Sequence, residues 1–300
     1  MEEKRTRAAG IRYTLLGGIC WGLSGCFGQF LFEEKGVTAD WLVTLRLTAA
    51  GLLLICIGLF YQRKQMKAIW KDRKDRKQLV LFSLGGMLFC QYTYFVAVEA
   101  SNAGTATVLQ SLAPLVILCI VCLYRKRLPA KKEAAGVFCA LLGVFLLSTH
   151  GDPHSMNLSG RALFFGLGAA VSAAAYNVLS GDLLRKYGVH AIVGYAMLLA
   201  GIVLSLFVRP WRYAVVWDGE ILMASLGVII VGTALAFSLY LKGVSIVGPL
   251  LGSVLGQMEP VTAILVSVLF LGQKFAWMDF AGFVLILGTV AALSLQKKKK

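Results

Sequence analysis

The chain has 300 residues, of which 58% are hydrophobic and only 15% are charged, whereas about a quarter of the residues in a soluble domain carry charge. This composition excludes an ordinary water-soluble core and indicates a protein embedded in lipid. The net charge of +15 does not by itself indicate nucleic-acid binding, because its Lys and Arg residues are concentrated in alternate loops.

Apolar stretches of about 20 residues, each long enough to cross a hydrocarbon layer as a helix, recur along the sequence. They are continuously apolar rather than alternating, which favours helices over barrel strands. The first stretch has no small-residue cleavage site, so we interpret it as a retained span. The predicted fold class is an all-α integral membrane bundle of ten transmembrane helices. They cover residues 12–31, 41–61, 79–98, 104–123, 135–149, 160–180, 190–208, 221–240, 249–271 and 278–295.

Every second loop is rich in Lys and Arg. The clusters include the N-terminal arm, the 62–78 connection, the 125–132 connection and the C-terminal KKKK. Because cytoplasmic loops carry this excess, both termini are expected in the cytoplasm, which requires an even number of crossings. The same clusters are suited to contact with anionic lipid head groups.

The second half of the chain repeats the first at an offset near 150 residues. The segment YFVAVEASNAGTATVLQSLAPLVIL from Tyr94 aligns with YLKGVSIVGPLLGSVLGQMEPVTAIL from Tyr240, so that Pro114 matches Pro260. We therefore divide the chain into a unit at 1–150 with spans one to five and a unit at 151–300 with spans six to ten. Since five is odd, the second unit enters the membrane inverted, as is typical of many secondary transporters.

Several motifs resemble those of an EamA-type member of the drug/metabolite transporter superfamily, and the resemblance covers essentially the whole chain. They are Trp21-Gly22, Arg46, the run GTATVLQSLAP ending at Pro114, and Glu259-Pro260 followed by LFLG. The chain departs from the family in having Gln273 where an acidic residue often follows LFLG. The resemblance implies a central cavity lined by the first four spans of each half, which carries metabolites or amino acids. It also implies that the fifth span of each half is peripheral or oligomeric.

Glu259 is the leading candidate for chemistry. Ten residues at about 1.5 Å each from Pro249 place it roughly 15 Å deep, close to the midplane. A carboxylate there must find a cation, find donors or stay protonated. It is therefore predicted to pair with a substrate amine, exchange a coupling proton, or hold Arg46 or a neighbouring helix. Arg46 lies nearer one surface, where it either snorkels to water or binds a substrate carboxylate.

The other candidate substrate-binding residues are polar or aromatic side chains within the spans: Trp21, Gln91, Tyr94, Gln110, Ser111, Tyr176, Asn177, Tyr240 and Gln257. The alternative for the amides is a hydrogen bond between helices, and for the tyrosines an interfacial anchor. Gln257 and Glu259 are about 200° apart around a helix, so both face one cavity only if Pro260 distorts the turn. Candidate hinge or packing residues are Pro114, Pro260, Gly248, Gly252 and Gly256.

The sequence favours a carrier over an enzyme. It has no nucleophile with a base, no H-E-x-x-H and no P-loop, so we predict no catalytic activity, no cofactor and no metal site. His150, His154 and Asp152 form only a weak metal signal, and the seven cysteines lie within the spans, where they act as small hydrophobic residues.

The expected function is a bacterial inner-membrane secondary transporter that exports or exchanges amino acids or related compounds, with coupling to protons as an open alternative. The alternatives are a carrier of organic cations, sugars or nucleotide sugars, and a membrane scaffold or sensor without transport activity. The expected partners are a small-molecule substrate and the lipid bilayer. Protons and a second copy of the chain are open alternatives, and nucleic acid is not expected.

Overall fold

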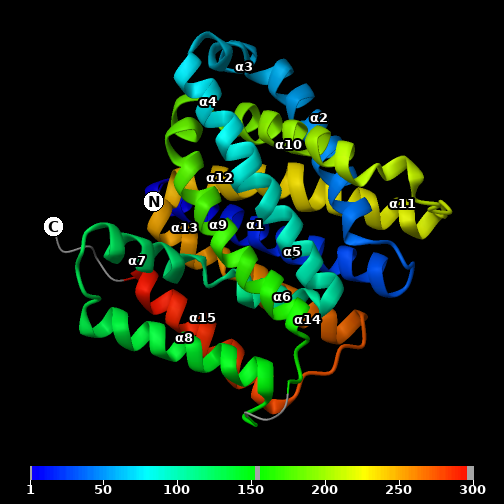
Figure 1. Ribbon diagram of the computed structural model, residues 1–300. Coiled ribbons are helices and arrows are strands. Elements are labelled where there is room, and N and C mark those ends of the chain that lie inside the picture. Colours follow the sequence, from blue (N-terminus) through cyan, green and yellow to red (C-terminus); the bar gives the residue numbers. More distant parts are fainter. Residues whose placement is uncertain (1, 153–155, 296–300) are drawn as a thin grey trace.

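The computed structural model describes residues 2–152 and 156–295, and within these ranges it contains helices and no strands (Figure 1). The first half comprises α1 (Glu2–Glu33), α2 (Ala39–Tyr61), α3 (Arg63–Ala68), η1 (Ile69–Lys71), α4 (Arg73–Leu81), η2 (Phe82–Leu88), α5 (Phe89–Ala100), α6 (Ala103–Gln110), α7 (Ala113–Tyr124) and α8 (Lys131–Thr149). The second comprises α9 (Gly160–Tyr187), α10 (Val189–Val208), η3 (Pro210–Arg212), α11 (Gly219–Leu226), η4 (Gly227–Leu235), α12 (Ala236–Val247), α13 (Pro249–Gly256), α14 (Met258–Phe270) and α15 (Trp277–Leu295).

The all-helical membrane fold is confirmed. Eight helical stretches in the described part of the chain are long and apolar enough to cross a membrane, and two shorter apolar helices cover Val254–Phe270 and Trp277–Leu293. Each predicted span falls on one of these ten stretches. The number of crossings is approximate, because two of the helices are shorter than the others. We call the end of the bundle that holds the Lys- and Arg-rich segment 63–77 the basic end.

The third and eighth spans each contain a turn of π-helix, at Phe82–Leu88 and Gly227–Leu235. These two segments are separated by nearly the same offset as the aligned tyrosines, so they are equivalent positions of the repeat. A π-turn shifts the backbone hydrogen-bond pattern and is frequent at functional sites. Neither turn was predicted from the sequence.

The fourth and ninth spans are each broken near the middle. The α6 helix ends at Gln110 and α7 begins at Ala113, while α13 ends at Gly256 and α14 begins at Met258. Pro114 and Pro260 follow the breaks at matching positions. Proline lacks an N–H and its ring clashes with the carbonyl four residues earlier, here Gln110 and Gly256, which are the last residues of α6 and α13.

Glycine allows the two halves to pack closely. Helices α2 and α10 lie against each other, where a Cβ on Gly51 would be 2.5 Å from the Leu198 nitrogen and one on Gly201 would be 2.6 Å from Thr48 Oγ1. In α1, a Cβ on Gly22 would be 2.6 Å from the Glu259 carbonyl oxygen. These small residues let backbones approach in lipid, where close packing drives association.

The three glycines of the predicted 248–256 motif do not share one packing role. Gly252 and Gly256 lie close to Val244 and Tyr240. Gly248 instead has a φ of 85°, with nothing within 4 Å of an added Cβ. The packing assignment of Gly248 is therefore wrong: glycine is needed there because the chain turns with positive φ between α12 and α13.

We expect Gly201→Ala to lower the free energy of unfolding by about 1–3 kcal/mol, because overpacking a tight contact forces side chains and backbone apart. The matched control is Gly181→Ala in α9, where an added Cβ meets nothing within 4 Å. Thermal unfolding in detergent measures both variants. Equal stability of the two would contradict the close α2–α10 packing.

Helices α8 and α15, the fifth spans of the two halves, form a separate pair at one side of the bundle (Figure 1). They pack mainly on each other, around buried Leu147, Ile286 and Val290. The larger hydrophobic core instead joins the first four spans of both halves. This division leaves the first four spans of each half to surround the centre of the molecule.

Candidate functional site

A cavity of about 350 Å³ lies at the centre of the bundle, between the two halves. All eleven candidate substrate-binding residues line it: Trp21, Arg46, Gln91, Tyr94, Gln110, Ser111, Tyr176, Asn177, Tyr240, Gln257 and Glu259. Pro114, Gly256 and Pro260 line it as well, whereas Gly248 and Gly252 do not. The tertiary structure thus gathers these side chains from seven of the predicted spans around one space.

The break between α13 and α14 brings both Gln257 and Glu259 to the cavity. Gln257 lies in the break itself, with φ −65° and ψ −1°, and Glu259 lies in the first turn of α14. The regular helical angle that would point them in opposite directions therefore does not apply. The Gln257 Oε1 atom is buried and has no hydrogen-bond partner in the described part of the protein.

Arg46 is buried in the bundle, with only 4% of its surface exposed. Its guanidinium lies 5.0 Å from the centre of the Phe95 ring and donates a 3.2 Å hydrogen bond to the Gly232 carbonyl, within the π-turn of the eighth span. The alternative that Arg46 snorkels to water is therefore wrong. Its Nε atom has no partner among the described residues, so this strong donor is left for another acceptor.

Arg46 and Glu259 face the same cavity without forming an ion pair. Both line it, yet the ion pairs found among the described residues include neither of them. A buried charge that lacks a charged partner is costly. A molecule that carries both charges and spans the gap would compensate both groups at once.

Aromatic rings form one wall of the cavity. The Trp21 ring centre lies 5.1 Å from that of Phe237 and 4.7 Å from that of Tyr240. Tyr94 is 6% exposed and its hydroxyl is 3.0 Å from the Thr107 hydroxyl. Tyr94, Tyr176 and Tyr240 all line the cavity, so the alternative that they are interfacial anchors is wrong for all three. The wall offers apolar area next to the charged groups.

Three of the polar candidates already have partners on nearby backbone or side chains. The Ser111 hydroxyl donates to the Val108 carbonyl at 2.6 Å, and the Asn177 amide donates to the Ala173 carbonyl at 2.8 Å. The Gln110 amide donates to the Cys90 thiol at 3.5 Å. These groups are thus less available to a ligand than Arg46 or Gln257.

Sequence reasoning missed several lining residues, including Cys90, Thr107, Ser180, Leu184 and Phe237. None carries a charge or a large amide, so nothing in the sequence distinguishes it from an ordinary helix residue. Sequence reasoning also missed a buried acid outside the cavity. Asp75 is only 9% exposed, at the basic end, where it is held by Lys186 and Tyr187.

The weak metal signal gains no support from the described residues, which contain no group of three or more His, Cys, Asp or Glu able to hold a metal ion. His150 instead contacts Asp279 at 2.9 Å, joining α8 to α15. His154 lies outside the described residues.

Comparison with known proteins identifies one family and several transporters that are similar to this chain. The model of the EamA-like transporter family matches residues 8–149 and again residues 160–295. The uncharacterized inner membrane transporter YicL of Salmonella typhimurium is 35% identical over 291 residues, covering 97% of each chain. The threonine/homoserine exporter RhtA of Escherichia coli is 28% identical over 271 residues, covering 88% of this chain and 82% of RhtA.

The fold is also similar to a solved structure described only as "Crystal structure of protein". The two chains superpose with a TM-score of 0.63 at 20% identity, over 95% of this chain and 96% of the other. At this identity the likeness concerns the fold alone.

Proposed function

This chain belongs to the EamA-like transporter family and is a membrane transporter, and from this premise we propose that it exports or exchanges amino acids or closely related zwitterions. One observation carries the proposal: Arg46 and Glu259 face one central cavity and are not paired with each other. A zwitterionic substrate would place its carboxylate at Arg46 and its ammonium at Glu259. The guanidinium fork matches carboxylate geometry.

Two further observations support the amino-acid assignment. The name of the 28% identical relative RhtA says that it exports threonine and homoserine, which are zwitterions. The wall formed by Trp21, Phe237 and Tyr240 would provide apolar contact for the rest of the substrate, since binding sites typically combine apolar walls with a few placed polar groups.

Glu259 is proposed to couple transport to protons. A carboxylate in the cavity can carry a proton when the cavity is empty and exchange it for the substrate ammonium. The breaks beside Pro114 and Pro260 are proposed as hinges, because interrupted helices near the midplane form the binding sites of many carriers. We also propose that residues 1–150 and 151–300 are the two repeat units.

The proposed location is a bacterial inner membrane with both termini and the basic end in the cytoplasm. The charge distribution supports this orientation, since Lys and Arg prefer the cytoplasmic side. The inner-membrane relative YicL supports the compartment. The α8–α15 pair is proposed as the contact surface of a homodimer, because it packs mainly on itself and lies at one side of the bundle.

We expect purified protein in liposomes to show saturable flux of a radiolabelled amino acid. Competition should require both charges: the amino acid should compete best, and its decarboxylated amine and its deaminated acid should each compete at least about 30-fold more weakly, as about 2 kcal/mol per lost charged contact implies. Competition by the amine alone would instead favour an organic-cation carrier. Ligand-induced thermal stabilisation without flux would favour a sensor.

A further inference from the structure

A buried polar cluster lies at the end of the bundle opposite the basic end. Gln29 in α1 is fully buried, and its amide oxygen accepts hydrogen bonds from the Ala103 N–H at 2.9 Å and the Ser267 hydroxyl at 3.1 Å. Its amide nitrogen donates to the Glu33 carboxylate at 3.0 Å, which also accepts from the Gln273 amide at 3.0 Å. One side chain therefore links α1 and α6 of the first half with α14 of the second.

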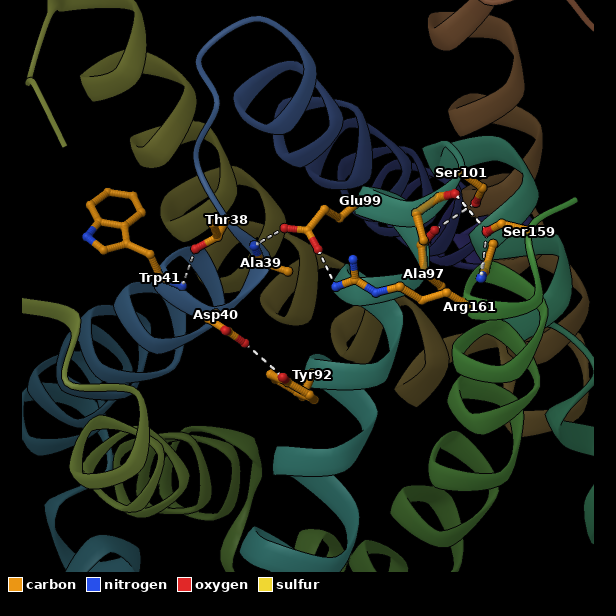
Figure 2. Close-up of polar contacts among 12 residues, drawn as sticks. Thr38, Ala39, Asp40, Trp41, Tyr92, Ala97, Glu99, Ser101, Ser159 and Arg161 are labelled. Carbon is orange, nitrogen blue, oxygen red and sulfur yellow. Dashed lines mark hydrogen bonds and ion pairs between the residues drawn. The ribbon is translucent and has the colours of Figure 1, made fainter. Parts of the chain in front are cut away.

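Charged residues around this cluster also join the two halves. Lys35 pairs with Asp218 at 2.9 Å and with Glu220. Arg161 pairs with Glu99 at 2.7 Å. Figure 2 shows the Glu99 carboxylate between the Arg161 guanidinium and the Ala39 N–H at the start of α2. Each ion pair thus ties a loop or helix end of the first half to one of the second.

Asp40 adds a further connection between the halves. It accepts a hydrogen bond from the Tyr92 hydroxyl at 2.8 Å (Figure 2) and one from the Tyr213 hydroxyl of the second half at 3.4 Å. Tyr213 follows η3, whereas Asp40 lies in the first turn of α2. The polar layer therefore extends across the starts or ends of most central spans.

The broken spans are arranged differently at the two ends. At the end opposite the basic end, α6 packs on α14, and a Cβ on Gly104 would be 3.1 Å from Ile264. Beyond the breaks, α7 packs on α9, and α13 packs on α1 and α12. The cavity lining continues along α9 to Leu184, close to the end of that helix at Tyr187. The lining of the cavity thus extends towards the basic end, whereas α6 and α14 pack together at the other.

We propose that the contacts of Gln29, Lys35 and Glu99 form a gate, which closes the end opposite the basic end and must separate whenever the cavity opens to that side. The inference rests on the proposed transport function. In this structure the carrier is in its state with the gate closed.

The chemistry of the gate suits repeated opening. The side chains of Arg161 and Glu220 remain 59% and 68% exposed, and exposed ion pairs are weak because water competes for both partners. Hydrogen bonds from the Ile221 N–H and Lys35 lower the pKa of Asp218, while those to Glu220 and Asp218 raise the pKa of Lys35. Both partners therefore stay charged at neutral pH, and separation rather than titration opens the pair.

A single-thiol chain tests the gate without any substrate. Of the seven cysteines it keeps Cys90, which lines the cavity, and has alanine at the others. A membrane-impermeant thiol reagent is applied to the two faces of the membrane in separate vesicle preparations. We expect Cys90 to react at least about tenfold faster from the face of the basic end.

Variants of Lys35 then open or restore the gate. Lys35→Glu should raise the Cys90 reaction rate from the opposite face about tenfold, because it turns attraction to Asp218 and Glu220 into repulsion. Adding Glu220→Lys should return the rate to that of the parent, because it restores an ion pair with reversed charges. Asp218 is unchanged and still caps α11 by accepting from the Ile221 N–H. The control is Arg127→Glu, which breaks the Arg127–Glu133 pair within one half and should leave both rates unchanged.

Several outcomes would overturn the proposal. These are equal reaction from both faces in the parent, no change in Lys35→Glu, or no restoration in the double variant. If Lys35→Glu only misfolded the chain, adding Glu220→Lys would not restore both the Cys90 reaction rate and the melting temperature of the parent. Since the thiol reaction needs no substrate, a shifted rate with no amino-acid flux would retain the gate and reject the substrate proposal. Amino-acid flux with unshifted Cys90 reaction rates would retain the substrate proposal and reject the gate.

Discussion

Replacing Glu259 by Gln is expected to abolish the pH dependence of transport. The amide is close in shape to the carboxylic acid but cannot exchange a proton or pair with an ammonium group. Among the lining residues of the central cavity, Glu259 is the sole carboxylate, so a substrate ammonium would have no other anionic partner there. We expect amino-acid affinity to fall about 30-fold or more, since removing one partner of a desolvated charge pair costs about 2–5 kcal/mol.

Proton release measures the coupling directly. Binding of an amino acid to the purified parent protein in weakly buffered detergent should displace the Glu259 proton, whereas Glu259→Gln should release none. Glu259→Asp keeps an ionisable group and should retain a pH-dependent profile. Asp182→Asn removes an exposed carboxylate that pairs with Arg185 within its own helix, and should leave the profile as in the parent. An unchanged pH profile in Glu259→Gln would reject the coupling role.

Replacing Arg46 by Gln is expected to weaken the binding of carboxylate-bearing substrates selectively. The loss for an amino acid should again be about 30-fold or more, while the decarboxylated amine should lose little because it has no group for Arg46. The discriminating quantity is the ratio of the two affinities. A ratio near that of the parent would contradict the proposed contact.

Arg46 also has a structural contact that the experiment must separate from binding. Its guanidinium donates to the Gly232 carbonyl, so any substitution leaves a buried acceptor with a weaker partner and lowers stability. Arg46→Lys keeps the charge and loses the fork, so it should preserve part of the selectivity for carboxylates. Equal losses for the amine and the amino acid, together with a reduced melting temperature, would assign Arg46 a role in folding.

Composition and periodicity were sufficient to predict most of the fold. Each apolar stretch must satisfy its own backbone in lipid, so length and hydropathy define a helix without knowledge of its neighbours. The matching of Pro114 with Pro260 likewise located equivalent positions in the two halves. The candidate site was predictable because polar groups such as Glu259 and Gln110 are costly inside lipid and stand out against apolar neighbours.

Other features of the site could not be predicted from spacing along one helix. In an unbroken helix Gln257 and Glu259 would lie on different faces, but the break at Gln257 lets both reach the cavity. Depth along the second span suggested that Arg46 snorkels, yet its guanidinium is held by Phe95 and Gly232 from other spans. In both cases a neighbouring helix or a local distortion overrides the local geometry.

The sequence alone determined that this protein is a helical membrane bundle of repeated halves and which side chains have no favourable place in lipid, because hydropathy and solvation are properties of each segment by itself. The tertiary structure alone decided where those side chains meet and which end of their cavity is closed. Contacts such as Lys35 with Asp218 and Gln29 with Ser267 join residues far apart in the chain, and their partners are set by how the two halves pack together.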